Sequence, residues 1–408
     1  MQISRPCSLS LLFALCACGP DVVPAAAWEF DVDPGTRVIE GVAVQPAGRA
    51  AEPVRITPMV RVSGGDDPLR AASRVAVDRS GRIYVLDEVD QQVRVYTPEG
   101  LLEHRLGGPG HGPGEMSPAV SGMVLAGDRL LLADAMLGRL TAWNLETMES
   151  ETVPLAMGEG LVADALQMQG RADGSVVVLY SQPDVGGASR SRSVRLGADG
   201  QMTEEYGAVP ERYTTIDLGG NSTVLPVARG QNQIAVAPDG RVYMTGADRY
   251  EVLALASDGT PRWVLRVPWE RAPMPEQEVE RAFEAVVGML RAMGEAPVLD
   301  RSTISDLPAL LPALESIKVD GQGRLWVFPY VYHPRDAGLP EGDRPVDVYD
   351  HDGRLLYSGV VPARFALNSE RGSAWMTVGG ALVYGVEADP ETGDPVIVGY
   401  RLELPVTP

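Results

Sequence analysis

A pattern of two apolar-alternating strands joined by a glycine-bearing turn recurs six times in this chain of 408 residues. The clearest copies are VAVDRSGRIYVLD (75–87), IAVAPDGRVYMTG (234–246) and IKVDGQGRLWVFP (317–329), and weaker copies occupy 123–134, 167–180 and 376–387. The turn glycines are Gly81, Gly127, Gly174, Gly240, Gly323 and Gly380. Each copy is followed by a third alternating segment, such as VRVYTPEG. Period-two alternation bounded by glycine turns is typical of antiparallel hairpins, so one β unit is repeated.

Six such units predict an all-β fold, a six-bladed β-propeller with four-stranded antiparallel blades. The last copy ends at Pro408, which leaves no room for a fourth strand. The segment VRITPMVRVSG (54–64) precedes the first copy and is expected to supply that strand. The two termini then close the ring together, which removes the free sheet edges of an open ring. Residues 51–408 are therefore predicted to form one propeller domain.

The first unit also carries a family resemblance. The run VAVDRSGRIYVLDEVDQQVRVYTPEG, followed by GGPGHGPGEMSPAV, resembles an NHL repeat. More broadly, the chain resembles the six-bladed β-propeller lipoproteins of Gram-negative bacteria over nearly its whole mature length. The resemblance implies the fold, whereas propellers host many unrelated activities and the fold alone implies none of them.

The first eighteen residues hold all three cysteines, Cys7, Cys16 and Cys18, around a short apolar core. The sequence LCAC ending at Cys18 resembles a bacterial lipobox, whose cysteine is acylated after cleavage. Residues 1–17 are then a lipoprotein signal peptide, and residues 18–50 an acylated cysteine with a flexible tether. The alternative is ordinary secretion with cleavage nearby. We expect a lipid-anchored protein of the bacterial cell envelope. Gly19 favours the outer membrane, on its periplasmic or its surface side.

The charge, composition and motifs of the chain argue against several function classes. A net charge of −20 argues against nucleic-acid binding, which needs clustered basic side chains. Lys318 is the only lysine beside 34 arginines, which leaves almost no candidate for Schiff-base chemistry. No GxSxG motif supports a serine hydrolase. The one cysteine of the mature chain is expected to be acylated, which excludes a cysteine nucleophile.

A helical insertion is predicted between the fourth and fifth blades, within residues 275–312. In 275–294, the residues Val279, Phe283, Val286, Leu290 and Met293 recur at helical spacing and form one apolar stripe. Pro275 suits the first turn and Gly294 the end. The helix is expected to pack over blades four and five, and the functional alternative is a lid or a helix that docks a partner.

Recurrent aspartates and arginines are interpreted first as scaffold. Asp78, Asp239 and Asp320 lie in the repeated turns, where an aspartate normally accepts hydrogen bonds from the amide two residues on. Asp87 with Arg94, and Asp134 with Arg139, flank the next hairpin in two adjacent blades. These pairs are expected to be ion pairs that brace the turn. The alternative is that Arg94 and Arg139 hold a ligand at the central channel.

Metal chemistry has weak support in the sequence. The four histidines, His104, His111, His333 and His351, are too dispersed for an imidazole-based zinc site. Lactonase-type propellers hold one divalent cation with a Glu, an Asn and an Asp, and the strand beginning at Asn232 resembles their Asn strand. Gln233 stands where an Asp is expected, so Asn232 with Asp87 form at most a partial site. We therefore expect no metal or cofactor, and keep a divalent cation such as calcium as the alternative.

Two loops are candidate recognition sites. The loop 329–345 combines Tyr330, Tyr332, His333 and Arg335, a mixture of aromatic surface and hydrogen-bonding groups typical of binding sites. The stretch RLGGPGHGPGEMSPA (105–119) leads to a strand and contains prolines, so it is not a phosphate cradle before a helix. It is predicted to connect two blades, with His111 and Glu115 as candidates for the rim of the pocket.

These observations favour a binding module over an enzyme. The predicted function is recognition of an envelope protein, a glycan or a small molecule through the axial pocket or one loop face. The membrane is contacted through the lipid anchor, and the protein is expected to be a monomer. The alternative is a metal-dependent, lactonase-like hydrolase or lyase on the same propeller.

Overall fold

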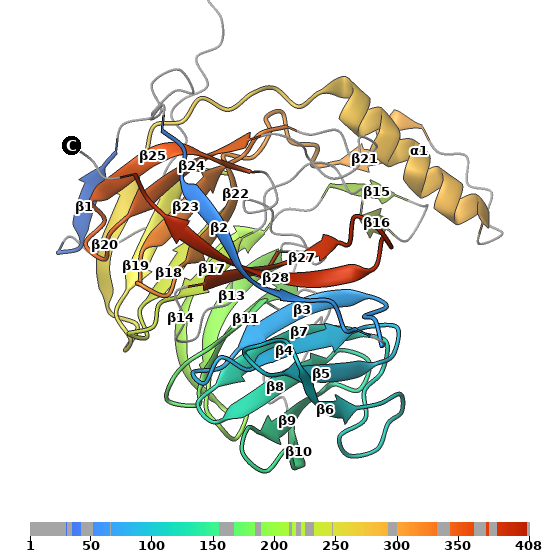
Figure 1. The fold of residues 1–408 in the computed structure, drawn as a ribbon. Coiled ribbons are helices and arrows are strands. Elements are labelled where there is room, and N and C mark those ends of the chain that lie inside the picture. Colours follow the sequence, from blue (N-terminus) through green and yellow to red (C-terminus); the bar gives the residue numbers. More distant parts are fainter. Residues whose placement is uncertain are drawn as a thin grey trace, which may run out of the picture.

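The protein is a six-bladed β-propeller, seen in a computed structural model (Figure 1). The structure describes residues 30, 35–41, 52–65, 67–154, 167–183, 189–211, 214–217, 222–224, 232–246, 248–292, 300–332, 343–362, 373–374 and 382–405. Each blade is built on an antiparallel sheet with its first strand innermost, and blades 4 and 6 each add one strand from the N-terminal part of the chain. The predicted fold class is therefore confirmed.

The first three blades contain only consecutive strands. Blade 1 comprises β3 (Ala72–Val77), β4 (Ile83–Asp87), β5 (Gln92–Tyr96) and β6 (Leu102–Gly107). Blade 2 comprises β7 (Val120–Ala126), β8 (Arg129–Asp134), β9 (Arg139–Asn144) and β10 (Ser150–Pro154). Blade 3 comprises β11 (Gln167–Gly170), β12 (Val176–Pro183), β13 (Ser189–Leu196) and β14 (Met202–Glu211).

Of the last three blades, blades 4 and 6 each include one strand from the N-terminal part of the chain. Blade 4 comprises β17 (Gln233–Val236), β18 (Val242–Thr245), β19 (Glu251–Leu255) and β20 (Pro261–Arg266), with β1 (Arg37–Glu40) on its outer edge. Blade 5 comprises β22 (Leu314–Val319), β23 (Leu325–Pro329), β24 (Asp343–Tyr349) and β25 (Leu355–Pro362). Blade 6 comprises β26 (Ser373–Ala374), β27 (Leu382–Ala388), β28 (Pro395–Glu403) and β2 (Arg55–Val62).

The ring closes as the sequence predicts, because β2 from the N-terminal side is the outer strand of blade 6. It runs antiparallel to β28, from the pair Arg55 and Glu403 to the pair Val62 and Ile397. The loop after β2 then enters blade 1 at β3. The closing blade thus combines strands from the two ends of the chain.

The repeated turns owe their shape to an aspartate and a glycine. Oδ1 of Asp78 accepts hydrogen bonds from the amides of Ser80 (2.9 Å) and Arg82 (3.0 Å). Gly81 adopts a φ of 87°, a backbone angle that residues with a Cβ atom disfavour and glycine adopts freely. Asp320 repeats these contacts in blade 5, with the amides of Gln322 (2.9 Å) and Arg324 (3.0 Å). The predicted structural role of these turn aspartates is therefore confirmed.

The hydrophobic core lies between neighbouring blades, where the faces of adjacent sheets pack together. Two glutamines also link successive inner strands. The side chain of Gln167 bonds to the carbonyl of Asn232 (3.1 Å) and the amide of Ile234 (3.4 Å) in blade 4. Gln233 repeats this arrangement one blade on, with the carbonyl of Glu315 (2.7 Å) and the amide of Ile317 (3.0 Å). Each side-chain amide satisfies one donor and one acceptor at an inner-strand edge.

The predicted helix is present as α1 (Glu276–Ala292). Three of its expected stripe residues, Val279, Val286 and Leu290, are buried, while Met293 lies outside the described residues. The helix packs on a small sheet of β15 (Thr215–Asp217), β16 (Ser222–Val224) and β21 (Ile304–Ser305). A short 3₁₀ helix, Arg301–Thr303, precedes β21. Within the described ranges, no helix is long and apolar enough to cross a membrane.

Candidate functional site

The two ends of the blades differ in what they carry. The short aspartate turns, such as 78–82, lie at one end. The loops between second and third strands and the connectors between blades lie at the other, which we call the connector face. The sheet of β15, β16 and β21 belongs to this face, because β15 follows blade 3 and β21 precedes blade 5. Figure 1 shows this sheet beneath α1, to one side of the ring.

The cap on the connector face, α1 with β15, β16 and β21, is assembled from two connectors. Thr215 and Ile216 pair with Ser305 and Ile304, so the connector from blade 3 to blade 4 and the connector from blade 4 to blade 5 share one sheet. Ile216 is fully buried against the apolar stripe of α1. The cap therefore has a small hydrophobic core of its own.

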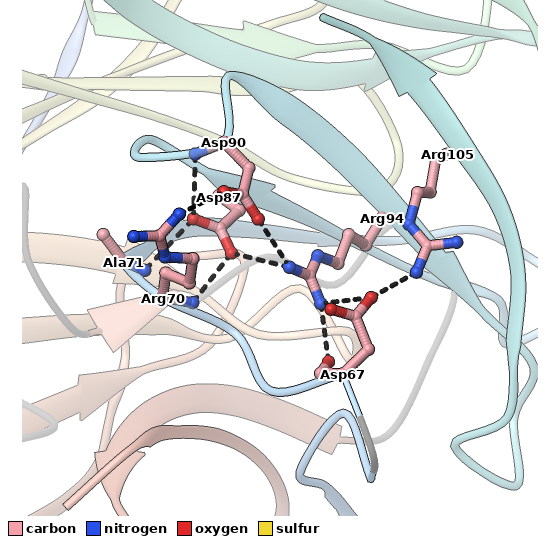
Figure 2. A network of polar contacts seen from close by, with 7 residues as sticks. All are labelled: Asp67, Arg70, Ala71, Asp87, Asp90, Arg94 and Arg105. Atoms are coloured by element: carbon pink, nitrogen blue, oxygen red, sulfur yellow. Dashed lines mark hydrogen bonds and ion pairs between the residues drawn. The ribbon is translucent and has the colours of Figure 1, made fainter.

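A buried network of charged groups braces the connector that enters blade 1 (Figure 2). Nη2 of Arg94 lies 2.7 Å from a carboxylate oxygen of Asp90 and 3.3 Å from one of Asp87. Nη1 of Arg94 lies 2.7 Å from the carbonyl oxygen of Asp67 and 3.2 Å from its carboxylate. The Asp67 carboxylate also pairs with Arg105. The predicted ion pair of Asp87 with Arg94 is thus present and is part of a larger cluster.

Asp87 also holds the backbone of the incoming connector. Its two carboxylate oxygens accept hydrogen bonds from the amides of Arg70 (2.8 Å) and Ala71 (3.1 Å). The Asp87 side chain is fully buried, and that of Arg94 is 1% exposed. The hydrogen bond from Arg105 holds the pKa of Asp67 below its usual value. The network therefore fixes the path from the closing strand β2 into blade 1.

The second predicted pair is arranged differently. Asp134 accepts hydrogen bonds from the amide (2.7 Å) and the hydroxyl (2.6 Å) of Ser117. Arg139 donates to three carbonyl oxygens of the same connector, those of His111 (3.1 Å), Gly112 (2.6 Å) and Glu115 (3.0 Å). The expected ion pair is therefore replaced by separate bonds to the chain from blade 1, because the glycine-rich loop turns its carbonyls towards the guanidinium.

The glycine-rich stretch connects blades 1 and 2, as predicted. Its Glu115 carboxylate accepts a hydrogen bond from the amide of Gly112 (2.7 Å) and so folds back onto its own loop. Met116 is fully buried in the core between blades 1 and 2. His111 is exposed. Glu115 is exposed as well, so both candidates for the rim are accessible to solvent.

The aromatic loop between β23 and β24, the second and third strands of blade 5, contacts the cap. The hydroxyl of Tyr332 lies 3.4 Å from Nη2 of Arg281 and 3.5 Å from a carboxylate oxygen of Glu278, both on α1. The amide of Tyr330 donates to the carbonyl of Ala313 (2.9 Å). His333 and Arg335 lie outside the described residues. Tyr332 is thereby placed on the connector face, next to the helix.

The candidate metal ligands lie in different blades. Asp87 belongs to blade 1, where backbone amides and Arg94 surround its carboxylate. Asn232 precedes the inner strand of blade 4, and its amide nitrogen donates to the hydroxyl of Ser191 (3.0 Å). No group of three or more His, Cys, Asp or Glu side chains with the geometry of a metal site is found in the part of the chain that the structure describes. Asp87 and Asn232 are thus each engaged by partners within the protein.

Lys318 is a buried residue that was not predicted as a site from the sequence. This lysine lies on β22, the inner strand of blade 5, and its cross-strand partner is Trp326. The equivalent pairs in blades 1 and 4 are Ala76 with Tyr84 and Ala235 with Tyr243. Burial lowers the pKa of Lys318 from its usual 10.5 to about 8, while the charge of Glu315 acts in the opposite direction. The available signal was the alignment of the three clear repeats, because the other two have alanine at the position of Lys318.

Comparisons with solved structures agree on the fold. A protein of Bacteroides fragilis described as exported matches 90% of this chain and 100% of its own, with 10% identity and a TM-score of 0.50. A member of the DUF4221 family from Bacteroides vulgatus matches 86% and 98%, with 13% identity and a TM-score of 0.43. The calcium-binding protein regucalcin from Agrobacterium tumefaciens matches 91% and 98%, with 13% identity and a TM-score of 0.39. No family model and no curated protein sequence matches the chain.

Proposed function

We propose that this protein is a binding module of the bacterial envelope that recognises a protein partner through its connector face. The observation that carries the proposal is the cap, because two connectors and a helix are elaborated together on one end of the propeller. Loops placed by a rigid scaffold are where binding residues concentrate. The hydrogen-bond networks around the buried Arg94 and the half-buried Arg139 support the proposal, since they fix two further connectors of the same face.

Exposed apolar side chains on this face favour a protein partner. Val89 and Met136 lie at the tips of the loops between second and third strands of blades 1 and 2, and are 53% and 62% exposed. On the cap, Met289 is 49% and Leu307 is 44% exposed. A protein interface gains free energy by covering such side chains, whereas a small polar ligand does not.

Photo-crosslinking in cells tests which face binds. A photoreactive residue is placed at Met289 or Leu307 on the connector face, and matched control variants carry it at Leu101 or Met202, in turns at the opposite end. We expect the photoreactive residue at Met289 or Leu307 to form specific adducts with a partner protein. An excess of mature protein without the photoreactive residue should compete for the partner and abolish these adducts. Adducts restricted to Leu101 and Met202 would contradict the proposal.

We also propose that Cys18 anchors the protein to the envelope membrane through attached acyl chains. Support comes from the lipobox-like LCAC sequence behind an apolar segment. An anchor of two or three chains binds a bilayer stably. The wild-type chain should sediment with outer-membrane fractions, and a Cys18→Ser variant should be soluble after export. A Cys18→Ser variant that still sediments with membranes would show that the anchor lies elsewhere.

A further inference from the structure

Phe30 lies in the core of the propeller, although it precedes every strand of the propeller in the sequence. Its side chain is buried among residues of blades 3 and 4, including Val209 and Val264. Its amide donates to Oε2 of Glu251 (3.3 Å), and its carbonyl accepts from Nη2 of Arg266 (2.9 Å). Nε of Arg266 lies 3.0 Å from Oε1 of Glu251, whose side chain is fully buried. This ion pair therefore clamps both backbone groups of Phe30.

The chain then forms β1 along the outer edge of blade 4. Four residues of β1 pair in parallel with β20, from Arg37 and Trp263 to Glu40 and Arg266. The amide of Gly41 continues the ladder to the carbonyl of Arg266 (2.8 Å). Ile39 packs on the core between blades 4 and 5. Phe30 lies on the blade 3 side and Ile39 on the blade 5 side, so this strap, Phe30 with residues 35–41, contacts both sides of blade 4. Figure 1 shows β1 of the strap beside β20.

The clamp places Phe30 at one rim of the propeller. Glu251 is the first residue of β19 and Arg266 the last residue of β20, so both lie at the connector-face end of blade 4. Phe30 is in the core between blades 3 and 4. Phe30 is therefore held at the rim between these two blades, next to the connector face.

We propose that the strap fixes how the propeller faces the lipid bilayer, with the connector-face rim of blades 3 and 4 next to the membrane and blade 1 away from it. The inference rests on the proposed lipid anchor at Cys18. Eleven residues, 19–29, separate Cys18 from Phe30, and at most about 3.6 Å per residue they span about 40 Å. Without the strap, the 35 residues 19–53 would separate Cys18 from the buried Val54, with a reach of about 125 Å.

The orientation is tested with fluorescent probes on the mature chain. Cys18 is replaced by an N-terminal hexahistidine tag that binds nickel-chelating lipids, so the test does not depend on native acylation. One new cysteine carries a dye, at Glu270 beside the clamp or, as the matched control, at Leu101 on blade 1 across the ring. Both positions are exposed, and the chain has no other cysteine after Cys18. The vesicles contain a lipid-attached quencher.

The expected result is severalfold stronger quenching at Glu270→Cys than at Leu101→Cys. Inserting about twenty Gly and Ser residues between residues 19 and 29 leaves the strap unchanged and should largely abolish the difference. Equal quenching at both positions with the native tether, or stronger quenching at Leu101→Cys, would overturn the orientation. If the native chain instead failed to partition with membranes, the proposed anchor at Cys18 would be contradicted. The orientation measured with the hexahistidine-tagged protein would still stand.

Discussion

Replacing Lys318 with methionine should stabilise the protein at neutral pH. The lysine is buried on the inner strand of blade 5, opposite Trp326, where the equivalent residues of blades 1 and 4 are alanines. Methionine has a similar length and no charge, so it can fill the same space without the cost of burying an ammonium group. The expected gain follows from the lowered pKa of the amine.

The magnitude follows from the linkage between protonation and folding. The pKa of Lys318 is lowered from 10.5 to about 8 in the folded protein. At pH 7 the amine is charged in both states, and the difference in pKa corresponds to about 3 kcal/mol of folding free energy lost. Between about pH 8 and about pH 10.5 the unfolded chain binds more protons than the folded one, so stability rises with pH. Above that range the amine is neutral in both states and the penalty disappears.

The assay is urea unfolding of the wild type and Lys318→Met at several values between about pH 7 and about pH 10.5. The advantage of the methionine variant should shrink by about 3 kcal/mol across this range, while effects of other titrating groups cancel. Lys318→Arg is the control, because its guanidinium stays charged throughout and should keep the protein destabilised at every pH. An advantage of Lys318→Met that stays constant with pH would refute the reasoning.

Three further predictions concern packing, the connector and metals. A methyl group on Gly170 would lie 1.7 Å from the carbonyl oxygen of Leu125, so Gly170→Ala should lower the free energy of unfolding by about 3 kcal/mol or more in urea titrations. Its control, Gly288→Ala on the exposed face of α1, meets no atom within 4 Å and should raise stability by up to about 1 kcal/mol; equal effects of the two would contradict this packing. Arg139→Ala removes three hydrogen bonds to the connector, so amide exchange should rise in 111–116 and not in the equivalent connector 63–71; unchanged exchange would show that Arg139 does not hold the loop. Because contacts within the protein already engage Asp87 and Asn232, millimolar calcium should leave the Tm unchanged, and a clear rise would support the metal-dependent alternative.

The repeated elements of this fold were predictable because their signals are local. Each hairpin is indicated by alternating apolar residues and by a turn such as that of Asp78 and Gly81. Because the last repeat lacks a fourth strand, β2 is then expected to close the ring. The helix was predictable for the same reason, since Val279, Val286 and Leu290 recur at helical spacing. Local periodicity therefore sufficed for the blades, the closure and α1.

The remaining features depend on partners distant in sequence, which no local pattern reveals. β1 is only four residues long and pairs with β20 more than two hundred residues later. Ile216 and Ile304 meet because two connectors happen to leave neighbouring blades at the same end. Asp134 and Arg139 are adjacent across β8 and β9, yet both bind the preceding connector, because backbone groups of that loop need partners. Spacing alone could not distinguish that arrangement from an ion pair.

The closing strand also orders events during synthesis. Arg55 of β2 pairs with Glu403 of β28, so β2, which is synthesised early, cannot pair until β28 has been synthesised. Joining segments 348 residues apart costs about 5 kcal/mol of loop-closure entropy, as (3/2)RT ln n, before any contact in the seam is formed. Blades 1 to 5 can form before the C-terminal part of the chain has been synthesised, whereas blade 6 cannot form until that part is complete. A nascent chain that stalls late is left with an unpaired β2, and proteases or chaperones would meet it at that edge.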